Sequence, residues 1–296
     1  MINLKEWTTA PAAADGAWGT ELLKAGLGQG EAPENWNTGN PEAVEGVARS
    51  YAEAGSRIIL TNTFGGTCFK LAHAGLDGRM AELNRTGARL TARAGGGEYL
   101  TAGDMGPTGK MVFMGEVSED EVTDAYARQA EALREGGADI LVLETFTDLT
   151  EIRAALAGAV KGGGCPVICS MTYDRMADGS FRTVMGHSPE DTVPVLAADG
   201  AAAVGANCGA GVDLYVSLAS VIGQLTDLPV WIKANAGLPV LEGSRVVYPM
   251  GPDEYASHIP ALLDAGVSII GGCCGTTPDH IRGIVRTLED YRGRGI

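Results

Sequence analysis

Residues 253–274, DEYASHIPALLDAGVSIIGGCC, decide the fold, because they hold a helix, a turn and a strand in direct succession. Residues 253–265 carry apolar side chains at helical spacing, and Gly266 ends the helix. Residues 267–272 form a continuous apolar run, which is typical of a parallel strand buried on both faces. A chain that repeats this unit is expected to build a parallel sheet covered by helices.

The unit does repeat, because eight apolar runs recur along the chain with helical segments between most of them. The runs are an Ala-rich segment that ends at Asp15-Gly16 and residues 57–62, 99–104, 140–144, 167–171, 203–208, 230–235 and 267–272. Residues 41–54 are a second expected helix, and Ser118 with Glu121 has the spacing of a capping box at the start of a third. The pattern predicts an α/β fold, a single (β/α)8 TIM barrel over residues 1–296 with no linker that divides it. The alternative is an open doubly wound sheet, but no glycine-rich fingerprint follows a first strand.

The amino-acid composition and net charge argue against several classes of function. The chain has 296 residues, 45% of them hydrophobic, and a net charge of −15. This balance disfavours disorder, binding to a nucleic-acid backbone and binding to an anionic membrane surface. No apolar stretch is long enough to span a bilayer, and the opening residues lack a signal-peptide pattern. With 6 cysteines and no secretory signal, we expect reduced thiols and a cytoplasmic protein.

Polar residues close most of the apolar runs. In a barrel of this kind the carboxyl ends of the strands share one mouth, where the chemistry is found. We therefore expect these side chains to face a common site: Asp15, Asn62, Asp104, Glu144, Cys208, Asn235, Cys273 and Cys274.

The cysteines give the most specific signal. Adjacent side chains on a regular strand point to opposite faces, so Cys273 and Cys274 can share a metal only where the flanking glycines let the chain leave strand geometry. Together with Cys208 they would supply three thiolates and leave one position open, as in a catalytic zinc site. The alternative is that they are small core residues, as free cysteines usually are. That structural interpretation is preferred for the other cysteines, which are Cys68, Cys165 and Cys169.

Two acids and one histidine are further candidates. Asp15 opens a turn that ends at Thr20, whose backbone N–H groups can hold a small carboxylate. Glu144 ends an apolar strand and needs a partner, either a substrate ammonium group or a structural hydrogen bond. Asp104 is interpreted as either a site acid or a turn-former. His187 is a loop histidine, more often solvated than catalytic. The remaining histidines, at 73, 258 and 280, fall in expected helices and are interpreted as structural.

The motifs together resemble the homocysteine S-methyltransferase family, and the resemblance runs from near residue 15 to near residue 285. The matching segments are residues 15–20 (DGAWGT), 60–65 (LTNTFG), 103–109 (GDMGPTG), 144–146 (ETF), 205–208 (GANC), 235–237 (NAG) and 271–278 (GGCCGTTP). Within the family the chain is most similar to the homocysteine-binding barrel of cobalamin-dependent methionine synthase.

The resemblance implies a zinc ion held by Cys208, Cys273 and Cys274, with Asn235 in the fourth position when substrate is absent. It also implies that the turn holds the amino-acid end of homocysteine together with Glu144. The turn residues concerned are Asp15, Gly16, Ala17 and Thr20. No general base is required, because zinc lowers the pKa of the substrate thiol.

Three functions remain open. The first is a zinc-dependent methyltransferase that makes methionine from homocysteine. Its donor is a methylated corrinoid on a separate protein or, alternatively, an onium compound such as betaine or S-methylmethionine, contacted by Trp18, Phe64 and Trp36. The second is a zinc-thiol binding or sensing barrel without turnover. The third is a metal-free aldolase-like barrel, which the absence of a lysine at the end of a suitable strand disfavours, although Lys233 lies within the run at residues 230–235.

Overall fold

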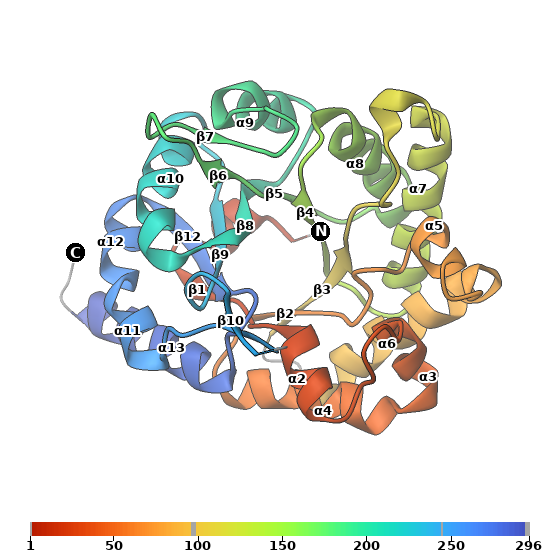
Figure 1. Ribbon diagram of the computed structural model, residues 1–296, viewed down its shortest axis with the longest axis horizontal. Coiled ribbons are helices and arrows are strands. Elements are labelled where there is room, and N and C mark those ends of the chain that lie inside the picture. The colour runs from red at the N-terminus through yellow and green to blue at the C-terminus, as the bar shows by residue number, and fades with distance from the viewer. Residues whose placement is uncertain (1, 96–98, 244, 294–296) are drawn as a thin grey trace.

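The computed structural model describes residues 2–95, 99–243 and 245–293, and an eight-stranded parallel barrel forms its centre (Figure 1). The strands are β1 (Ala12–Ala13), β2 (Ile58–Leu60), β3 (Leu100–Met105), β4 (Ile140–Phe146), β5 (Val167–Met171), β8 (Ala203–Gly211), β9 (Val230–Asn235) and β12 (Val267–Gly272). They are ordered β1-β12-β9-β8-β5-β4-β3-β2, and a parallel bridge from Ala14 to Ile58 closes the ring. The predicted (β/α)8 barrel is confirmed, and the open doubly wound sheet is excluded.

Helices surround the barrel, as Figure 1 shows. They are α2 (Trp18–Lys24), α3 (Trp36–Gly39), α4 (Pro41–Glu53), α5 (Cys68–Ala72), α6 (Met80–Ala94), α7 (Glu119–Glu135), α8 (Leu149–Gly163), α9 (Pro189–Ala198), α10 (Val212–Gln224), α11 (Pro252–Ser257), α12 (Ile259–Asp264) and α13 (Pro278–Gly293). The helix predicted over residues 41–54 corresponds to α4. The capping box is present at the start of α7, where Ser118 and Glu121 bond to each other's backbone.

One helix prediction was too long. The segment expected to form a single helix over residues 253–265 is divided at His258 into α11 and α12. Pro260 explains the break, because a proline has no N–H to donate and its ring collides with the carbonyl group four residues earlier.

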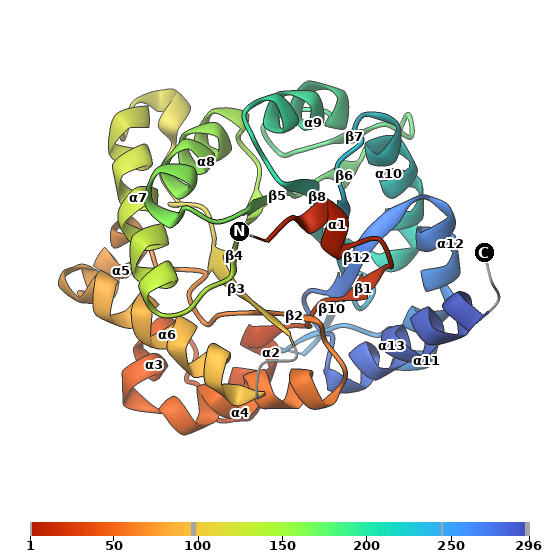
Figure 2. The same cartoon turned by 180° about the vertical axis from the view of Figure 1, so that it is seen from behind.

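The interior of the barrel is filled in layers. Along β9 the alternate residues Trp231, Lys233 and Asn235 share one face, and Lys233 Nζ lies 5.7 Å from the centre of the Trp231 ring. Gly271 on β12 makes room for this lysine, because a Cβ atom there would lie 3.0 Å from Lys233 Cγ. At the end where the strands begin, the short helix α1 (Leu4–Trp7) lies across the barrel opening (Figure 2).

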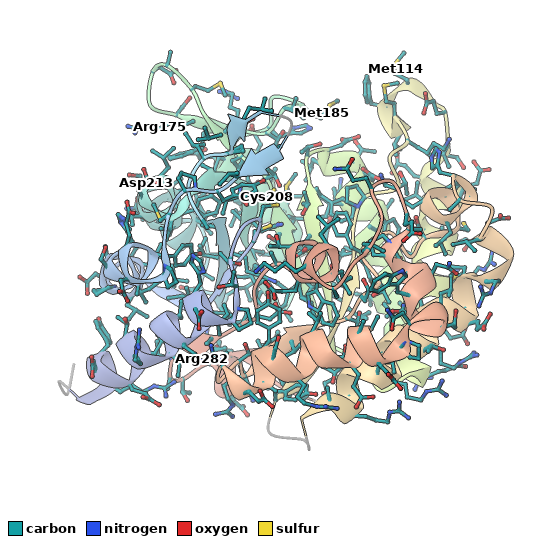
Figure 3. All side chains as sticks on the ribbon, turned by 60° about the horizontal axis from the view of Figure 1, so that its bottom comes forward. Met114, Arg175, Met185, Cys208, Asp213 and Arg282 are labelled. Carbon is teal, nitrogen blue, oxygen red and sulfur yellow. The ribbon has the colours of Figure 1, made fainter. Side chains whose placement is uncertain are left out.

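The loops that follow the strands form the opposite end. They include two hairpins, β6 (Asp174–Arg175) with β7 (Phe181–Arg182) and β10 (Val240–Glu242) with β11 (Arg245–Val247). Exposed apolar side chains gather on these loops, and we call the following set the apolar rim: Phe113, Met114, Val184, Met185, Leu238 and Leu241. Figure 3 shows Met114 and Met185 at this end of the molecule. Within the described part of the chain, no helix combines the length and hydropathy needed to cross a bilayer.

Candidate functional site

Three cysteines meet at the mouth of the barrel. Cys208 lies near the end of β8, and Cys273 and Cys274 directly follow β12. The Cys274 sulfur is 4.0 Å from each of the other two, and all three sulfur atoms lie within 4.8 Å of one another. Zinc–sulfur bonds of about 2.3 Å in a tetrahedron place the sulfur atoms about 3.8 Å apart. The cluster therefore fits a tetrahedral metal ion after small adjustments.

The backbone leaves strand geometry at both cysteine segments, as expected from the flanking glycines. Cys208 has φ 63° and Gly209 φ 61°, so two consecutive left-handed residues turn the end of β8. Gly275 has φ 81°, and a Cβ atom there would lie 2.2 Å from Tyr248 Cβ. Left-handed backbone costs free energy in a residue other than glycine, so the surrounding contacts must hold Cys208 in place.

Hydrogen bonds supply that support. The Tyr215 hydroxyl donates to the Cys208 carbonyl oxygen at 2.6 Å. The Cys273 N–H donates to the Ala234 carbonyl oxygen at 2.7 Å, and the Thr276 hydroxyl donates to the Cys273 carbonyl oxygen at 2.7 Å. The backbone of Cys208 and Cys273 is therefore held in place by contacts within the protein.

The three thiols share protons unequally. Hydrogen bonds from Cys208 and Cys273 lower the pKa of Cys274 to about 3. The hydrogen bonds of Cys273 with Cys208 and Cys274, together with burial, raise the pKa of Cys273 above its ordinary value. One thiol of the cluster is thus prepared as a thiolate, the form that binds metal.

Asn235 links the two cysteine segments. Its Oδ1 accepts from the Cys274 N–H at 3.1 Å, and its Nδ2 donates to the Gly209 carbonyl oxygen at 3.4 Å. The side chain is buried and does not line the cavity described next. In this geometry Asn235 positions the cysteines, and its role as a fourth ligand stays a prediction.

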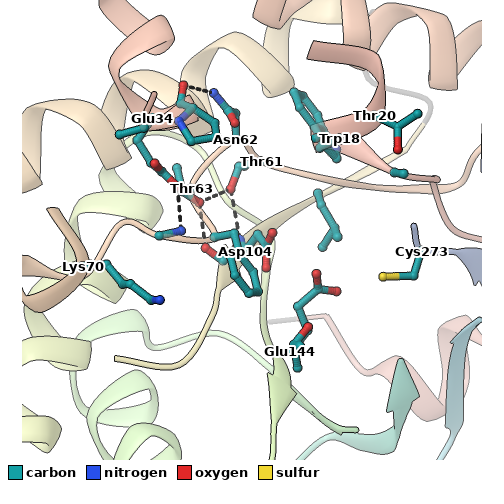
Figure 4. A pocket seen from close by; sticks show the side chains of 18 of the residues that line it. Trp18, Thr20, Glu34, Thr61, Asn62, Thr63, Lys70, Asp104, Glu144 and Cys273 are labelled. Atoms are coloured by element: carbon teal, nitrogen blue, oxygen red, sulfur yellow. Dashed lines mark hydrogen bonds between the residues drawn. The ribbon is translucent and has the colours of Figure 1, made fainter. Parts of the chain in front are cut away.

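A cavity of about 620 Å³ opens beside the cysteines (Figure 4). All three cysteines line one side of it, and Glu144 and Asp104 lie on its wall. Its far side is lined by Glu34, Phe64 and Lys70. The volume is typical of a site for small molecules.

The turn after β1 forms another wall. Residues 16–20 line the cavity, and α2 starts at Trp18 with no side chain capping it, so N–H groups of its first turn lack an intrahelical acceptor. Only glycine fits at position 16, because a Cβ atom would lie 2.8 Å from the Tyr51 hydroxyl oxygen. The predicted substrate residues Gly16, Ala17 and Thr20 are therefore brought to the cavity.

Asp15 is placed differently from what its predicted role would require. Its Oδ1 forms an ion pair with Lys233 Nζ at 2.6 Å, and its Oδ2 accepts from Trp18 Nε1 and from the Leu60 N–H, each at 2.8 Å. Asp15 is fully buried and does not line the cavity, whereas Lys233 does. The carboxylate is thus satisfied within the protein.

This ion pair also weakens the aldolase hypothesis. Burial lowers the pKa of Lys233, but Asp15 and Glu144 outweigh that effect and raise it above the ordinary value. A Schiff base requires a neutral amine, and this lysine is held as a cation.

Glu144 and Asp104 are the unsatisfied acids of the cavity. Oε2 of Glu144 and Oδ1 of Asp104 are buried and, among the described residues, have no hydrogen-bond partner. Burial raises the pKa of Glu144 to about 7, with Asp15 and Cys274 adding to it and Lys233 opposing. Burial and the neighbouring Glu144 raise the pKa of Asp104 well above its ordinary value. Each group therefore requires a cationic or hydrogen-bonding partner.

Other candidates lie outside the cluster. His187 is in the loop before α9, and its Nε2 is 3.9 Å from Asp148 Oδ1. Cys169 is buried, and Cys165 is half-buried against the core, as the structural interpretation expects. Trp18 and Phe64 line the cavity, but Trp36 does not.

Sequence reasoning missed two features of the site. Lys233 was considered only as a nucleophile, although a buried lysine in an apolar strand signals a carboxylate partner. Tyr248, beside Gly275, contributes a hydrogen bond that lowers the pKa of Cys274, and no sequence pattern marked it.

The comparisons with known proteins agree on one family. The family model described as homocysteine S-methyltransferase matches residues 13–288. The chain is 32% identical over 294 residues to methionine synthase of Mycobacterium leprae and 30% identical over 296 residues to that of Mycobacterium tuberculosis. These matches cover 93% and 94% of this chain but only 24% of each relative.

Solved structures show the same relationship. The metallated form of the homocysteine methyltransferase MmuM from Escherichia coli is similar with a TM-score of 0.75 and 25% identity, over 93% of this chain and 96% of that one. A methyltransferase from Methanosarcina mazei has a TM-score of 0.59 at 12% identity, over 96% and 95% of the two chains, and shares the fold.

Proposed function

The chain belongs to the homocysteine S-methyltransferase family, and we propose that it transfers a methyl group to the thiol of homocysteine to give methionine. The observation that carries the proposal is the cluster of three cysteine sulfur atoms within 4.8 Å of one another on the wall of a cavity. A metal centre suits the activation of an acceptor thiol, and the adjoining cavity has room for the rest of the substrate.

We propose zinc as the metal. Sulfur ligands suit zinc, and three protein ligands with one open position are typical of its catalytic sites. When bound, zinc would lower the pKa of a substrate thiol from about 8.5, so that the sulfur is a thiolate at neutral pH. We further propose that Asn235 takes the fourth position while no substrate is bound.

The chain's own residues would orient the acceptor. The turn at residues 16–20 would hold the homocysteine carboxylate through N–H groups other than that of Ala17, which donates to Thr276 Oγ1 at 3.1 Å, and Glu144 would hold its ammonium group. The sulfur then attacks the methyl carbon opposite the leaving group. The S–C bond forms as the bond between the donor and the methyl group breaks, and the donor keeps that electron pair. This step needs positioning and no general base.

We propose a methylated corrinoid on a separate protein, or on a further domain, as the donor. Two observations support it. The chain spans about a quarter of the length of the methionine synthases that it matches. The apolar rim lies on loops that follow the strands, at the end of the barrel from which a macromolecular donor would have to approach.

An onium compound is the second candidate donor. Trp18 and Phe64 line the cavity, and aromatic faces attract onium cations.

The test is a panel of donors with zinc-loaded protein and homocysteine, scored by methionine formed. The panel holds methylcobalamin, betaine, S-methylmethionine and S-adenosylmethionine. Methionine from methylcobalamin alone would support the corrinoid proposal, and methionine from an onium donor alone would replace it with the second candidate. If no donor works although homocysteine binds, the zinc-thiol binding function replaces the methyltransferase proposal.

A site of reduced thiols is typical of the cytoplasm, where we propose that the protein acts.

A further inference from the structure

We propose that Asp104 and Glu144 act as a pair that binds the α-ammonium group of the acceptor, and that Asp104 is a specificity-determining residue. The inference rests on the proposed function, because it concerns the amino-acid end of the same substrate. It assigns a role to a residue that the sequence left as either a site acid or a turn-former.

The first step is that Asp15 has no capacity left for a substrate cation. Lys233 Nζ lies 2.6 Å from Asp15 Oδ1 and supplies the positive charge from within the protein. Two N–H groups donate to Asp15 Oδ2. The pair has exposed fractions of 0% and 2%, so water does not compete with it. Any substrate ammonium group must therefore be bound by other acids.

The second step is that Asp104 and Glu144 face the same space. In the sheet Asp104 is paired with Val142, which precedes Glu144 by two residues, so all three side chains point to one face. Both acids line the cavity, with exposed fractions of 4% and 8%. Figure 4 shows their carboxyl groups on the cavity wall across from Cys273.

The third step is that Asp104 is held rigidly but left unsatisfied. Its N–H donates to Thr61 Oγ1 at 3.0 Å, and its carbonyl oxygen accepts from Thr63 Oγ1 at 2.7 Å. These contacts fix the strand end and leave side-chain Oδ1 without a partner in the described chain. A turn-former would use that oxygen for a local N–H group.

The fourth step concerns charge. Lys233 is bonded to Asp15, so it is not the hydrogen-bond partner of the buried oxygens of Asp104 and Glu144. An ammonium group has three donors and one positive charge, and it can serve both carboxyl groups at once. A hard divalent cation would need six or more oxygen ligands, which two carboxyl groups do not supply.

The experiment compares two ligands by calorimetric titration of the zinc-loaded protein. Homocysteine carries the ammonium group, and 4-mercaptobutanoate is the same thiol acid without it. In Asp104→Asn we expect the preference for homocysteine to fall about tenfold or more, because one charge-assisted hydrogen bond is removed. Binding of 4-mercaptobutanoate and the zinc content should stay unchanged.

The matched control is Glu31→Gln, which removes the same charge from an exposed position on the rim of the same cavity. Its preference for homocysteine should equal that of the wild type. If Asp104→Asn does not fold, as judged by circular dichroism, Asp104→Ser removes the carboxylate with a smaller side chain and is titrated instead.

The outcomes separate the two proposals. Equal weakening of both ligands in the Asp104 variant, or no weakening, overturns the role of Asp104 while homocysteine remains the acceptor. The same holds if the wild type binds the two ligands equally well. If the wild type binds neither thiol, the proposed acceptor is wrong and the inference fails with it.

Discussion

Cys208 combines a reactive side chain with a left-handed backbone, at φ 63°. Thr145, next to Glu144, is the other residue apart from glycine with positive φ in the described chain, at φ 67°. Asn207 joins the two, because its side chain accepts from the Thr145 N–H at 2.9 Å and donates to the Thr145 hydroxyl at 2.7 Å. Strained residues near the ends of β4 and β8, which have β5 between them in the sheet, are therefore held by one amide, and they sit where the chemistry is proposed.

Replacing Cys208 tests the metal centre. We expect Cys208→Ser to lower the zinc content of the purified protein and to abolish methionine formation, because a hydroxyl is a much weaker zinc ligand than a thiolate. Metal analysis and the donor assay measure the two effects. Cys165→Ser is the control, since Cys165 is a half-buried thiol outside the cluster. Full zinc content and activity in Cys208→Ser would refute the assignment.

Glu144 is expected to destabilise the protein when it is charged. Its pKa is about 7 in the folded state against an ordinary value of 4.5, so the folded protein binds more protons than the unfolded one between these pH values. Stability therefore falls as pH rises through this window, by up to about 3 kcal/mol at pH 8. We expect Glu144→Gln to be more stable than the wild type at pH 8 and to lose this advantage at pH 4. Urea unfolding of both proteins at pH 8 and at pH 4 measures this difference in stability. An equal difference at the two pH values would contradict the prediction.

Glu144 is also expected to contribute to the binding of homocysteine. Glu144→Ala removes the proposed partner of the substrate ammonium group, so KM for homocysteine should rise. An unchanged KM in steady-state assays would remove Glu144 from the site.

At the scale of elements, β9 connects the core to the site through alternate residues. Lys233→Met should lower the free energy of unfolding by about 3–5 kcal/mol, because it leaves the Asp15 carboxylate buried without a counter-charge. The double variant Asp15→Asn with Lys233→Met should recover part of the loss, since both charges are then absent. Denaturant unfolding measures this, and a single variant as stable as the wild type would show that the ion pair contributes nothing.

The helices and strands could be predicted from the sequence wherever the local pattern of apolar residues determines them. All eight apolar runs became barrel strands, because strands buried on both faces read as continuous apolar segments. The helix over residues 253–265 was predicted without its break, because apolar periodicity continues across Pro260 while the hydrogen bonding does not.

The site was predictable only in part. Cys208, Cys273 and Cys274 were found because their residue type and flanking glycines are locally unusual, and the structure brings them together. The pairing of Asp15 with Lys233 was not found, because it joins residues 218 positions apart and exists only when the barrel closes. Local sequence shows which residues can react, whereas closure determines which charges neutralise each other.

At the scale of the whole molecule, the apolar rim contrasts with a chain of net charge −15. If a corrinoid protein docks there, Leu241→Glu should reduce methyl transfer from that protein about tenfold or more and leave transfer from free methylcobalamin unchanged. Val160→Glu is the control, because Val160 is an exposed apolar residue of α8 outside the rim. Equal loss with both donors would assign Leu241 to the substrate site and not to docking.

The end of the barrel where the strands begin has a consequence for the kinetics of the enzyme. Helix α1 lies across that end and Trp231 fills the interior beneath Lys233, so the described cavity is reached from the mouth. A donor protein seated on the apolar rim would cover this entrance. Homocysteine would then have to enter before the donor protein binds, and methionine could leave only after it departs. We expect a compulsory order of binding, in which a large excess of donor protein slows turnover by occupying the entrance of the empty enzyme.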